Sequence, residues 1–203
     1  MTEPDAESVT PRPREKRVRV LLDRALSASA GVVALCALAV SMYQAWIARE
    51  QQRMSAWPYV TQTNTGAGGY GRLVQNVGLG PALVRSMRVE VDGVPVRQWS
   101  ALLMAALRVD TAGLRSRLPR DGYTTSSVLP GMVLLPGTTS ELIHVSDSTF
   151  GRVLRGVMND PRVHVRICYC SLYRDCWVSD SRALEPTKAD ECPSAYPAVE
   201  FQS

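Results

Sequence analysis

Residues 25–48 read ALSASAGVVALCALAVSMYQAWIA, a stretch without a charged side chain that is bounded by Arg24 and Arg49. At ~1.5 Å per residue, a helix over this stretch is ~36 Å long, enough to cross a hydrocarbon core of ~30 Å with some tilt. Tyr43 and Trp46 lie near its second end, where amphipathic rings settle at the membrane boundary. The stretch therefore predicts one transmembrane helix, retained in the mature protein.

Three other interpretations of this apolar stretch fit its sequence less well. A cleaved secretory signal needs a site of small residues, and 37–39 (Ala-Leu-Ala) fits, but the apolar run continues from Val40 to Ile47. A lipoprotein signal ending at Cys36 would need a small residue where Leu35 stands. A buried core helix rarely has so long an uncharged stretch in a soluble domain of this size.

Charge predicts the orientation of the span, because loops on the cytoplasmic side have an excess of Lys and Arg. Basic residues gather before it, and only Arg49 and Arg53 follow it closely; those before it are Arg12, Arg14, Lys16, Arg17, Arg19 and Arg24. We therefore expect a disordered cytoplasmic tail over 1–24, the span over 25–48, and the rest of the chain outside. Residues 49–56 predict a helical stalk, which Trp57-Pro58 ends.

Residues 57–203 show alternating apolar and polar positions and frequent turn residues, the pattern of a β-rich domain. The clearest strand is 83–92, with Leu83, Met87, Val89 and Val91 on one face and Arg85 as the polar exception there. Asp92-Gly93 predicts a hairpin turn. Short helices are expected over 100–107, capped by Ser100, and over 149–158. We expect 109–127 to be an irregular surface loop. The fold class predicted is a mainly-β domain, an immunoglobulin-like antiparallel β-sandwich with one or two short helices.

The most informative strand of this domain is 162–171, which contains two cysteines. Its apolar side chains alternate on one face, and His164, Arg166, Cys168 and Cys170 alternate on the other. Two positions apart on one face, the two cysteines are ~7 Å apart, a poor geometry for bonding to each other. The preferred pairing is Cys170 with Cys176 across a hairpin, and Cys168 with Cys192. The alternatives left open are a copper or zinc site built from His164, Cys168 and Cys170, and free redox-active thiols.

The sequence offers no pattern for catalysis or cofactor binding. Residues 78–83 resemble half of a dinucleotide-binding loop, but Leu83 stands where the third glycine belongs and the next segment alternates like a strand. There are two histidines, His144 and His164, both on predicted strands, and no Gly-x-Ser-x-Gly motif. The net charge of +4 is modest and its basic residues do not cluster after the span, which argues against nucleic acid as a partner.

The order of features resembles a loose group of uncharacterised bacterial single-pass membrane proteins. The resemblance rests on Gln51 and Gln52 after the apolar helix, on Trp57-Pro58, and on 76–82, a turn of the Asn-x-Gly-x-Gly-Pro-Ala type. It covers roughly 40–95, and the residues around Cys170 and Cys176 look similar too. The resemblance implies an inner-membrane protein with a periplasmic β-domain. It implies no activity and assigns no functional residues.

The leading functional hypothesis is a membrane-anchored, non-enzymatic envelope protein whose periplasmic domain mediates protein interaction. The partner expected is another envelope protein or a second copy, for which Ser27, Gly31 and Ala34 offer a stripe of small residues on the span. The alternative is an envelope metal- or redox-sensing protein that uses the cysteine strand. A hydrolase whose lid is 109–127 is a third hypothesis.

Overall fold

The computed structural model describes residues 13–66, 69–126, 128–193 and 201. The chain divides into two units, one ending at Gln51 and one beginning at Gln52. Each unit is described by itself below.

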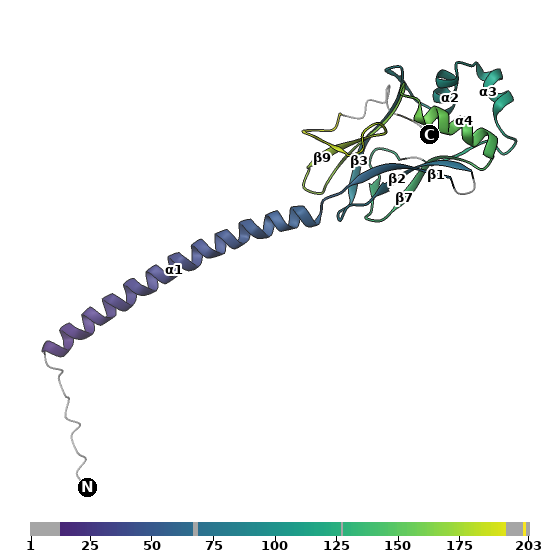
Figure 1. Cartoon of the computed structure of the whole chain (residues 1–203). Coiled ribbons are helices and arrows are strands. Elements are labelled where there is room, and N and C mark those ends of the chain that lie inside the picture. The colour runs from purple at the N-terminus through teal and green to yellow at the C-terminus, as the bar shows by residue number, and fades with distance from the viewer. Residues whose placement is uncertain (1–12, 67–68, 127, 194–200, 202–203) are drawn as a thin grey trace, which may run out of the picture. The chain divides into compact units, whose positions relative to one another are not determined.

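The described residues of the first unit form one long helix, α1, which runs on into the first residues of the second unit (Figure 1). It spans Pro13–Ser55 and is 43 residues long. From Val20 to Ser55 it is long and apolar enough to cross a membrane, judged by length and composition alone. Most of its described apolar side chains are exposed within the chain; Leu35, for instance, is 68% exposed.

This helix begins earlier than expected. Residues 13–24, expected to belong to a disordered tail, are helical. Pro13 suits the first helical position, and good helix formers such as Leu21 and Leu22 follow it. Adding residues to an existing helix costs little compared with starting one, so the helix extends back from the apolar stretch. Of the expected stalk, 49–56, residues 49–55 form the last turns of the same helix, which ends at Ser55.

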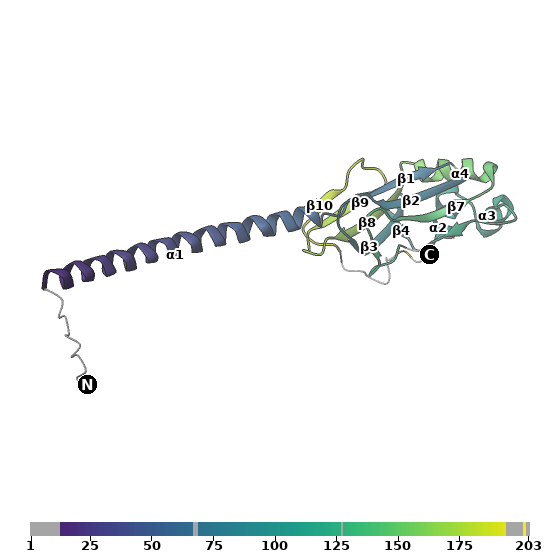
Figure 2. The same ribbon diagram turned by 90° about the horizontal axis from the view of Figure 1, so that it is seen from below.

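The second unit contains two antiparallel sheets (Figure 2). The smaller sheet has the strand order β1-β2-β7-β5, and its strands are β1 Val60–Thr65, β2 Tyr70–Asn76, β7 Thr139–Val145 and β5 Thr124–Thr125. The larger sheet has the order β10-β9-β8-β3-β4, with β6 beside the start of β3. Its strands are β3 Ala82–Val91, β4 Val94–Val96, β6 Val133–Leu134, β8 Val163–Cys170, β9 Cys176–Asp180 and β10 Thr187–Ala189. The predicted mainly-β, antiparallel domain is thus confirmed.

Three helices accompany these sheets: α2 Trp99–Leu107, α3 Thr111–Arg117 and α4 Ser148–Asn159. Helix α4 connects β7 of the smaller sheet to β8 of the larger one, and the Asp147 carboxylate caps it by accepting from the Phe150 backbone N–H. Helix α2 begins after Gln98, so the predicted cap at Ser100 is wrong. Helix α3 lies within 109–127, which was expected to be irregular. Asp110 caps it and Leu114 anchors it in the core.

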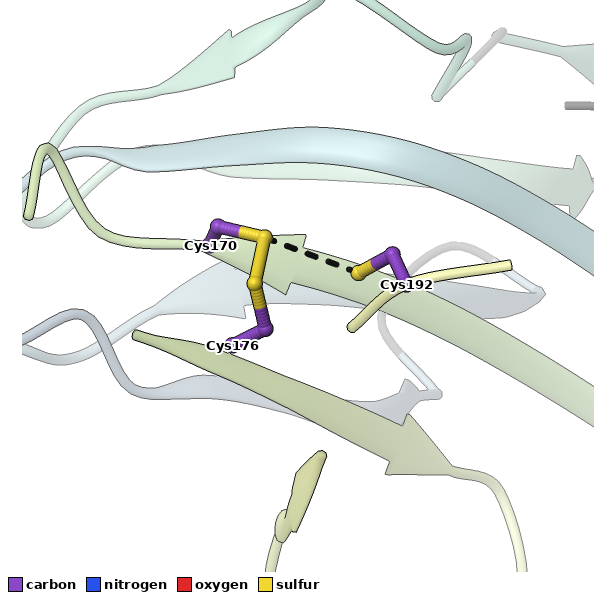
Figure 3. A group of neighbouring side chains, drawn as sticks. All are labelled: Cys170, Cys176 and Cys192. Atoms are coloured by element: carbon purple, nitrogen blue, oxygen red, sulfur yellow. Dashed lines mark hydrogen bonds between the residues drawn. A yellow bond between two sulfur atoms is a disulfide. The ribbon is translucent and has the colours of Figure 1, made fainter. Parts of the chain in front are cut away.

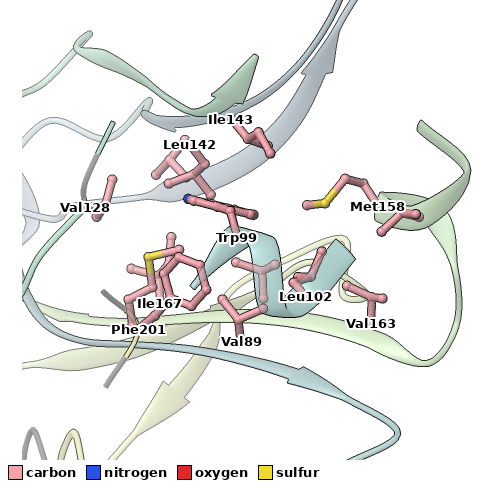
Figure 4. Close-up of a cluster of buried hydrophobic side chains, with 14 of the residues drawn as sticks. Val89, Trp99, Leu102, Val128, Leu142, Ile143, Met158, Val163, Ile167 and Phe201 are labelled. Atoms are coloured by element: carbon pink, nitrogen blue, oxygen red, sulfur yellow. The ribbon is translucent and has the colours of Figure 1, made fainter. Parts of the chain in front are cut away.

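Both sheets and the helices share one apolar core. Val163, Val165, Ile167 and Tyr169 of β8 are fully buried, as their alternation predicted. Figure 4 shows Trp99 of α2 between Leu142 and Ile143 of β7 and the side chains of the larger sheet. The Phe201 ring packs edge-on against Trp99, with 4.8 Å between ring centroids, and the Phe201 N–H donates to the Met87 carbonyl. Residue 201 therefore completes the core from far along the chain.

Strand β3 contains an irregularity that changes its predicted faces. Its register against β8 shifts between Val84 and Ser86. Before the shift Ala82 and Val84 are buried, and after it Met87, Val89 and Val91 are buried, while Arg85 is exposed. The expected assignment of Leu83 to the core face is therefore wrong. A β-bulge accounts for Arg85, because the extra residue lets the strand switch faces and directs this side chain away from the core.

Asn76, at the end of β2, holds together the segment where the chain passes from one sheet to the other. Its side chain is fully buried. The Nδ2 group donates to the carbonyls of Gly80 and Leu134 at 2.8 Å each, and Oδ1 accepts from the backbone N–H groups of Tyr59 at 3.2 Å and Gly78 at 3.0 Å. All four hydrogen-bonding positions of this amide are thus used.

Asn76→Ala is expected to lower the free energy of unfolding of the β-rich domain by about 3 kcal/mol or more, because two buried and two part-buried backbone groups lose their partner. Gln75→Ala is the matched control on the same strand, since Gln75 is only half-buried, and should cost less than about 1 kcal/mol. Chemical unfolding of the full chain in detergent, followed by tryptophan fluorescence, measures both. Equal stabilities of the two variants would contradict this role for Asn76.

Candidate functional site

The four cysteines of the β-rich domain come together around the end of the β8–β9 hairpin. Cys170 and Cys176 face each other in its register. Both expected pairs lie at disulfide distance: Cys168 is bonded to Cys192 and Cys170 to Cys176. Cys168 and Cys170 share the strand face opposite the apolar one, so each bonds to a partner beyond the strand. Cys36, in α1, is free and exposed.

The two disulfides are in contact with each other. The Cys170 and Cys192 Sγ atoms are 3.6 Å apart, and the Sγ atoms of Cys170, Cys176 and Cys192 all lie within 4.8 Å of one another (Figure 3). No signal in the sequence indicates this contact, because the position of Cys192 depends on the path of the segment after β10. Among the described residues it is the one group of potential metal ligands with this spacing.

The metal set suggested by the strand alternation, His164 with Cys168 and Cys170, is not the group that the structure brings together. The His164 imidazole instead faces the Asp180 carboxylate, with 3.5 Å between Nδ1 and Oδ1. Cysteine binds a metal as its thiolate. Here the sulfur atoms are paired as disulfides, which contain no thiolate. In this oxidised state the cysteines crosslink the domain and offer no ligand.

A pocket of about 460 Å³ opens beside these sulfur atoms. Its wall contains the three clustered cysteines and four charged side chains: Arg85, Arg174, Asp190 and Glu191. The bulge in β3 places Arg85 there, and the turn between β8 and β9 places Arg174, whose φ of 65° gives the chain its sharp reversal. Cys192 is half-buried, whereas Cys168, Cys170 and Cys176 are buried. Of the four sulfur-bearing residues, Cys192 is therefore the most open to solvent.

Buried polar side chains connect the two sheets. The Val60 N–H of β1 donates to the Tyr169 hydroxyl of β8 at 3.1 Å, and the Gln62 amide donates to the Val165 and Ser179 carbonyls at 3.0 Å each. Burial raises the pKa of Tyr169 to about 12, despite the hydrogen bond from Val60, which lowers it. Arg72 donates to Gln62 at 3.2 Å and to Asn64 at 2.9 Å.

The Arg72 guanidinium has no carboxylate among its described partners. Burial lowers its pKa, and the neighbouring charge of Arg182 lowers it further, while Tyr70 raises it. Its contacts go to the neutral amides of Gln62 and Asn64, and Gln62 in turn reaches the larger sheet. We therefore assign Arg72 to the network that joins the sheets.

Two aspartates of this domain, Asp147 and Asp180, have structural partners. Asp147 caps α4. Asp180 accepts from Arg166 at 2.9 Å, and Arg166 also donates to Glu90 at 3.0 Å. Burial alone would raise the pKa of Asp180, but the hydrogen bonds from Arg166 and Arg182 and the nearby positive charges hold it below the usual range. A carboxylate kept ionised in this way serves as an ion-pair partner.

Exposed apolar side chains gather at the end of the domain where the chain enters it. The N–H groups of Leu79 and Val77 donate to the carbonyls of Trp57 and Tyr59. The start of β3 pairs with the end of β8, which leads into the turn at 171–175. We name this surface the apolar end, and its exposed side chains are Trp57, Val77, Leu79, Leu135, Leu172 and Tyr173.

No family model matches the chain, and neither the curated proteins nor the solved structures contain a match to it. The resemblance to bacterial single-pass membrane proteins therefore stays a prediction.

Removing the two disulfides separately should cost different amounts of stability. Their sequence separations are 24 and 6 residues. In the chain-entropy model, replacing Cys168 and Cys192 by serine costs about 3 kcal/mol, and replacing Cys170 and Cys176 costs about 2 kcal/mol. Cys36→Ser, which removes no crosslink, is the control and should leave unfolding unchanged. The prediction fails if either double variant unfolds at the same denaturant concentration as the parent.

Tyr169→Phe should destabilise the domain by about 1–3 kcal/mol, because the buried Val60 N–H loses its acceptor.

The raised pKa of Tyr169 also predicts a pH dependence. The contribution of the neutral hydroxyl is complete below about pH 10, the ordinary tyrosine pKa, and declines as the pH rises toward about 12. Unfolding measured at pH 8 and pH 11 should show a smaller alkaline loss in Tyr169→Phe than in the exposed control Tyr173→Phe.

Proposed function

We propose that this chain is a membrane-anchored, non-enzymatic protein of the bacterial envelope whose outer domain binds another protein. In this proposal α1 crosses the inner membrane with the N-terminus in the cytoplasm, and the domain lies in the periplasm. The excess of basic residues before the span supports this orientation. The two disulfide-bonded pairs support it as well, since disulfides persist in oxidising compartments. An immunoglobulin-like sandwich is the arrangement that we propose for the two sheets.

The observation that most favours a binding function is the apolar end. Leu79 is 72% exposed and Leu172 is 62% exposed, beside Trp57 and Tyr173. Scattered apolar side chains are normal on a surface, but a group of them at one end marks an interaction site. Tryptophan and tyrosine are also the residue types enriched at the energetic centres of protein interfaces.

The backbone beneath this surface is firmly held, which favours binding. Asn76 fixes the loop that presents Val77 and Leu79, and Gly80 is packed so closely that a Cβ there would overlap the Ala56 carbonyl. A preformed surface loses little conformational entropy when a partner binds. The loop is thus suited to present its apolar side chains in one geometry.

The position of the apolar end indicates what kind of partner fits it. Residues 52–57 enter the domain at this end, and only a short helical segment separates them from the apolar stretch 25–48. In this proposal the short connection keeps the apolar end within reach of proteins in the same membrane. We therefore propose a second protein of the same membrane, with apolar side chains exposed next to its own span.

Photo-crosslinking in cells tests this proposal with the full-length chain. A photo-reactive amino acid at position 79 should give a discrete protein adduct, to be identified by mass spectrometry. The matched control is position 94, because Val94 is 62% exposed but follows the opposite end of β3. Leu172→Asp should reduce the adduct at position 79, whereas Val94→Asp should not.

Each outcome of this experiment is informative. A protein adduct specific to position 79 supports the proposal, and an adduct with a second copy of the chain identifies self-association. Identical adducts at positions 79 and 94, or adducts with lipid alone, would contradict a protein-binding function of the apolar end.

A further inference from the structure

The contact between the two disulfides is more than crosslinking requires. Two bonds that only hold the hairpin and the C-terminal segment in place have no need to touch. Yet the Cys192 Sγ atom lies 3.6 Å from the Cys170 Sγ atom, close to van der Waals contact between sulfurs. Figure 3 shows the Cys192 side chain pointing at the Cys170–Cys176 bond. A thiolate formed at Cys192 would therefore have a disulfide directly beside it.

The Cys192 sulfur is the one that a reductant in solvent reaches most readily. Its side chain lines the pocket and is more open than those of the other three cysteines. Arg85 and Arg174 line the same pocket, and positive charges nearby favour the thiolate over the thiol. Asp190 and Glu191 bring negative charge to the same wall, so the two arginines are opposed by two carboxylates. The charges of this wall balance, so it is the exposure of Cys192, rather than its electrostatic surroundings, that makes it the first cysteine a reductant reaches.

We propose that the pocket over Cys192 is a thiol–disulfide exchange site that takes an electron pair from a dithiol and passes it to the Cys170–Cys176 bond. The proposal goes beyond protein binding and does not depend on the apolar end.

The first step is the reduction of the Cys168–Cys192 bond by the dithiol. One thiolate of the dithiol attacks the Cys192 sulfur, which forms a mixed disulfide and releases Cys168 as a thiolate. The second thiol of the dithiol, as its thiolate, then attacks the first dithiol sulfur, which is bonded to Cys192 in the mixed disulfide. This step releases the Cys192 thiolate. The dithiol leaves as a cyclic disulfide, and its two protons go to Cys168 and to solvent. The chain has then gained two electrons.

The second step is internal and changes no oxidation state overall. The Cys192 thiolate attacks the Cys170 sulfur, the Cys170–Cys192 bond forms, and the Cys170–Cys176 bond breaks with Cys176 leaving as the thiolate. Attack requires the incoming sulfur to align with the bond that breaks. Opening of the Cys168–Cys192 bond allows this, because Cys192 is then free to rotate about its own side-chain bonds. In the product the C-terminal segment remains crosslinked to β8. The two strands of the hairpin are no longer crosslinked to each other.

Partial reduction of the full-length chain in detergent tests the proposal directly. The chain is treated with a limiting amount of dithiothreitol, quenched in acid, alkylated at its thiols and mapped by mass spectrometry. The expected intermediate has a Cys170–Cys192 bond and alkylated Cys168 and Cys176. If only the two native pairs and fully reduced cysteines are found at every dose, the proposal is wrong.

A variant gives a second test that needs no added reductant. Cys168→Ser, in a Cys36→Ser background, leaves Cys192 without its partner beside the Cys170–Cys176 bond. At equilibrium the thiol label should be divided between Cys192 and Cys176, because attack of the Cys192 thiolate on Cys170 releases Cys176. Label confined to Cys192 would overturn the proposal.

The matched variant Cys176→Ser tests the same contact from the other side. In this variant Cys170 is a free thiol. Its attack on Cys192 should release Cys168, so the thiol label should be divided between Cys170 and Cys168. The same chain unfolded in denaturant is the control for random exchange.

Discussion

Four hydrogen bonds made by the Asn76 amide hold the part of the fold on which the rest of the domain depends. The chain leaves the smaller sheet at this residue and enters the larger one at Ala82. The same side chain reaches Leu134, beside the turn through which β6 leads back to the smaller sheet. A carboxylate has no N–H to donate there, and an apolar residue has neither donor nor acceptor, so an amide is the group that fits. Gly78 and Gly80 allow the backbone of 56–59 to approach this loop closely.

Much of the domain could be predicted where one local signal decides the structure. The alternation along β8 identified its buried face, and Asp92-Gly93 identified a turn in which both residues have positive φ, 54° and 77°. Helix α4 followed from its own local pattern. Elsewhere the outcome depends on distant residues. The bulge at Arg85 follows from the pairing of β3 with β8. Helix α3 depends on the burial of Leu114 in the core, and the residues next to Leu114 in sequence do not indicate this burial.

The candidate site divides in the same way. Strand alternation disfavoured a bond between Cys168 and Cys170, and that local argument led to the preferred pairs. The contact between the Cys170 and Cys192 sulfurs was not predictable, because it depends on how the segment after β10 returns across the sheet. The bulge in β3 places Arg85 in the wall of the pocket. In the sequence the bulge is visible only as a polar residue on the apolar face of the predicted strand. The apolar end was missed because its side chains come from loops without periodicity.

Phe201 in the core has a consequence for how the domain is made. The pocket beside Trp99 is filled by a residue that the ribosome adds about a hundred positions later, and the Val60–Tyr169 hydrogen bond joins residues 109 positions apart. Such non-local contacts form slowly, because long loops must close first. The strands that are synthesised first therefore cannot complete their packing until the last segments are available. A chain still being synthesised has no complete core. The domain therefore completes its core only after nearly the whole chain has been synthesised.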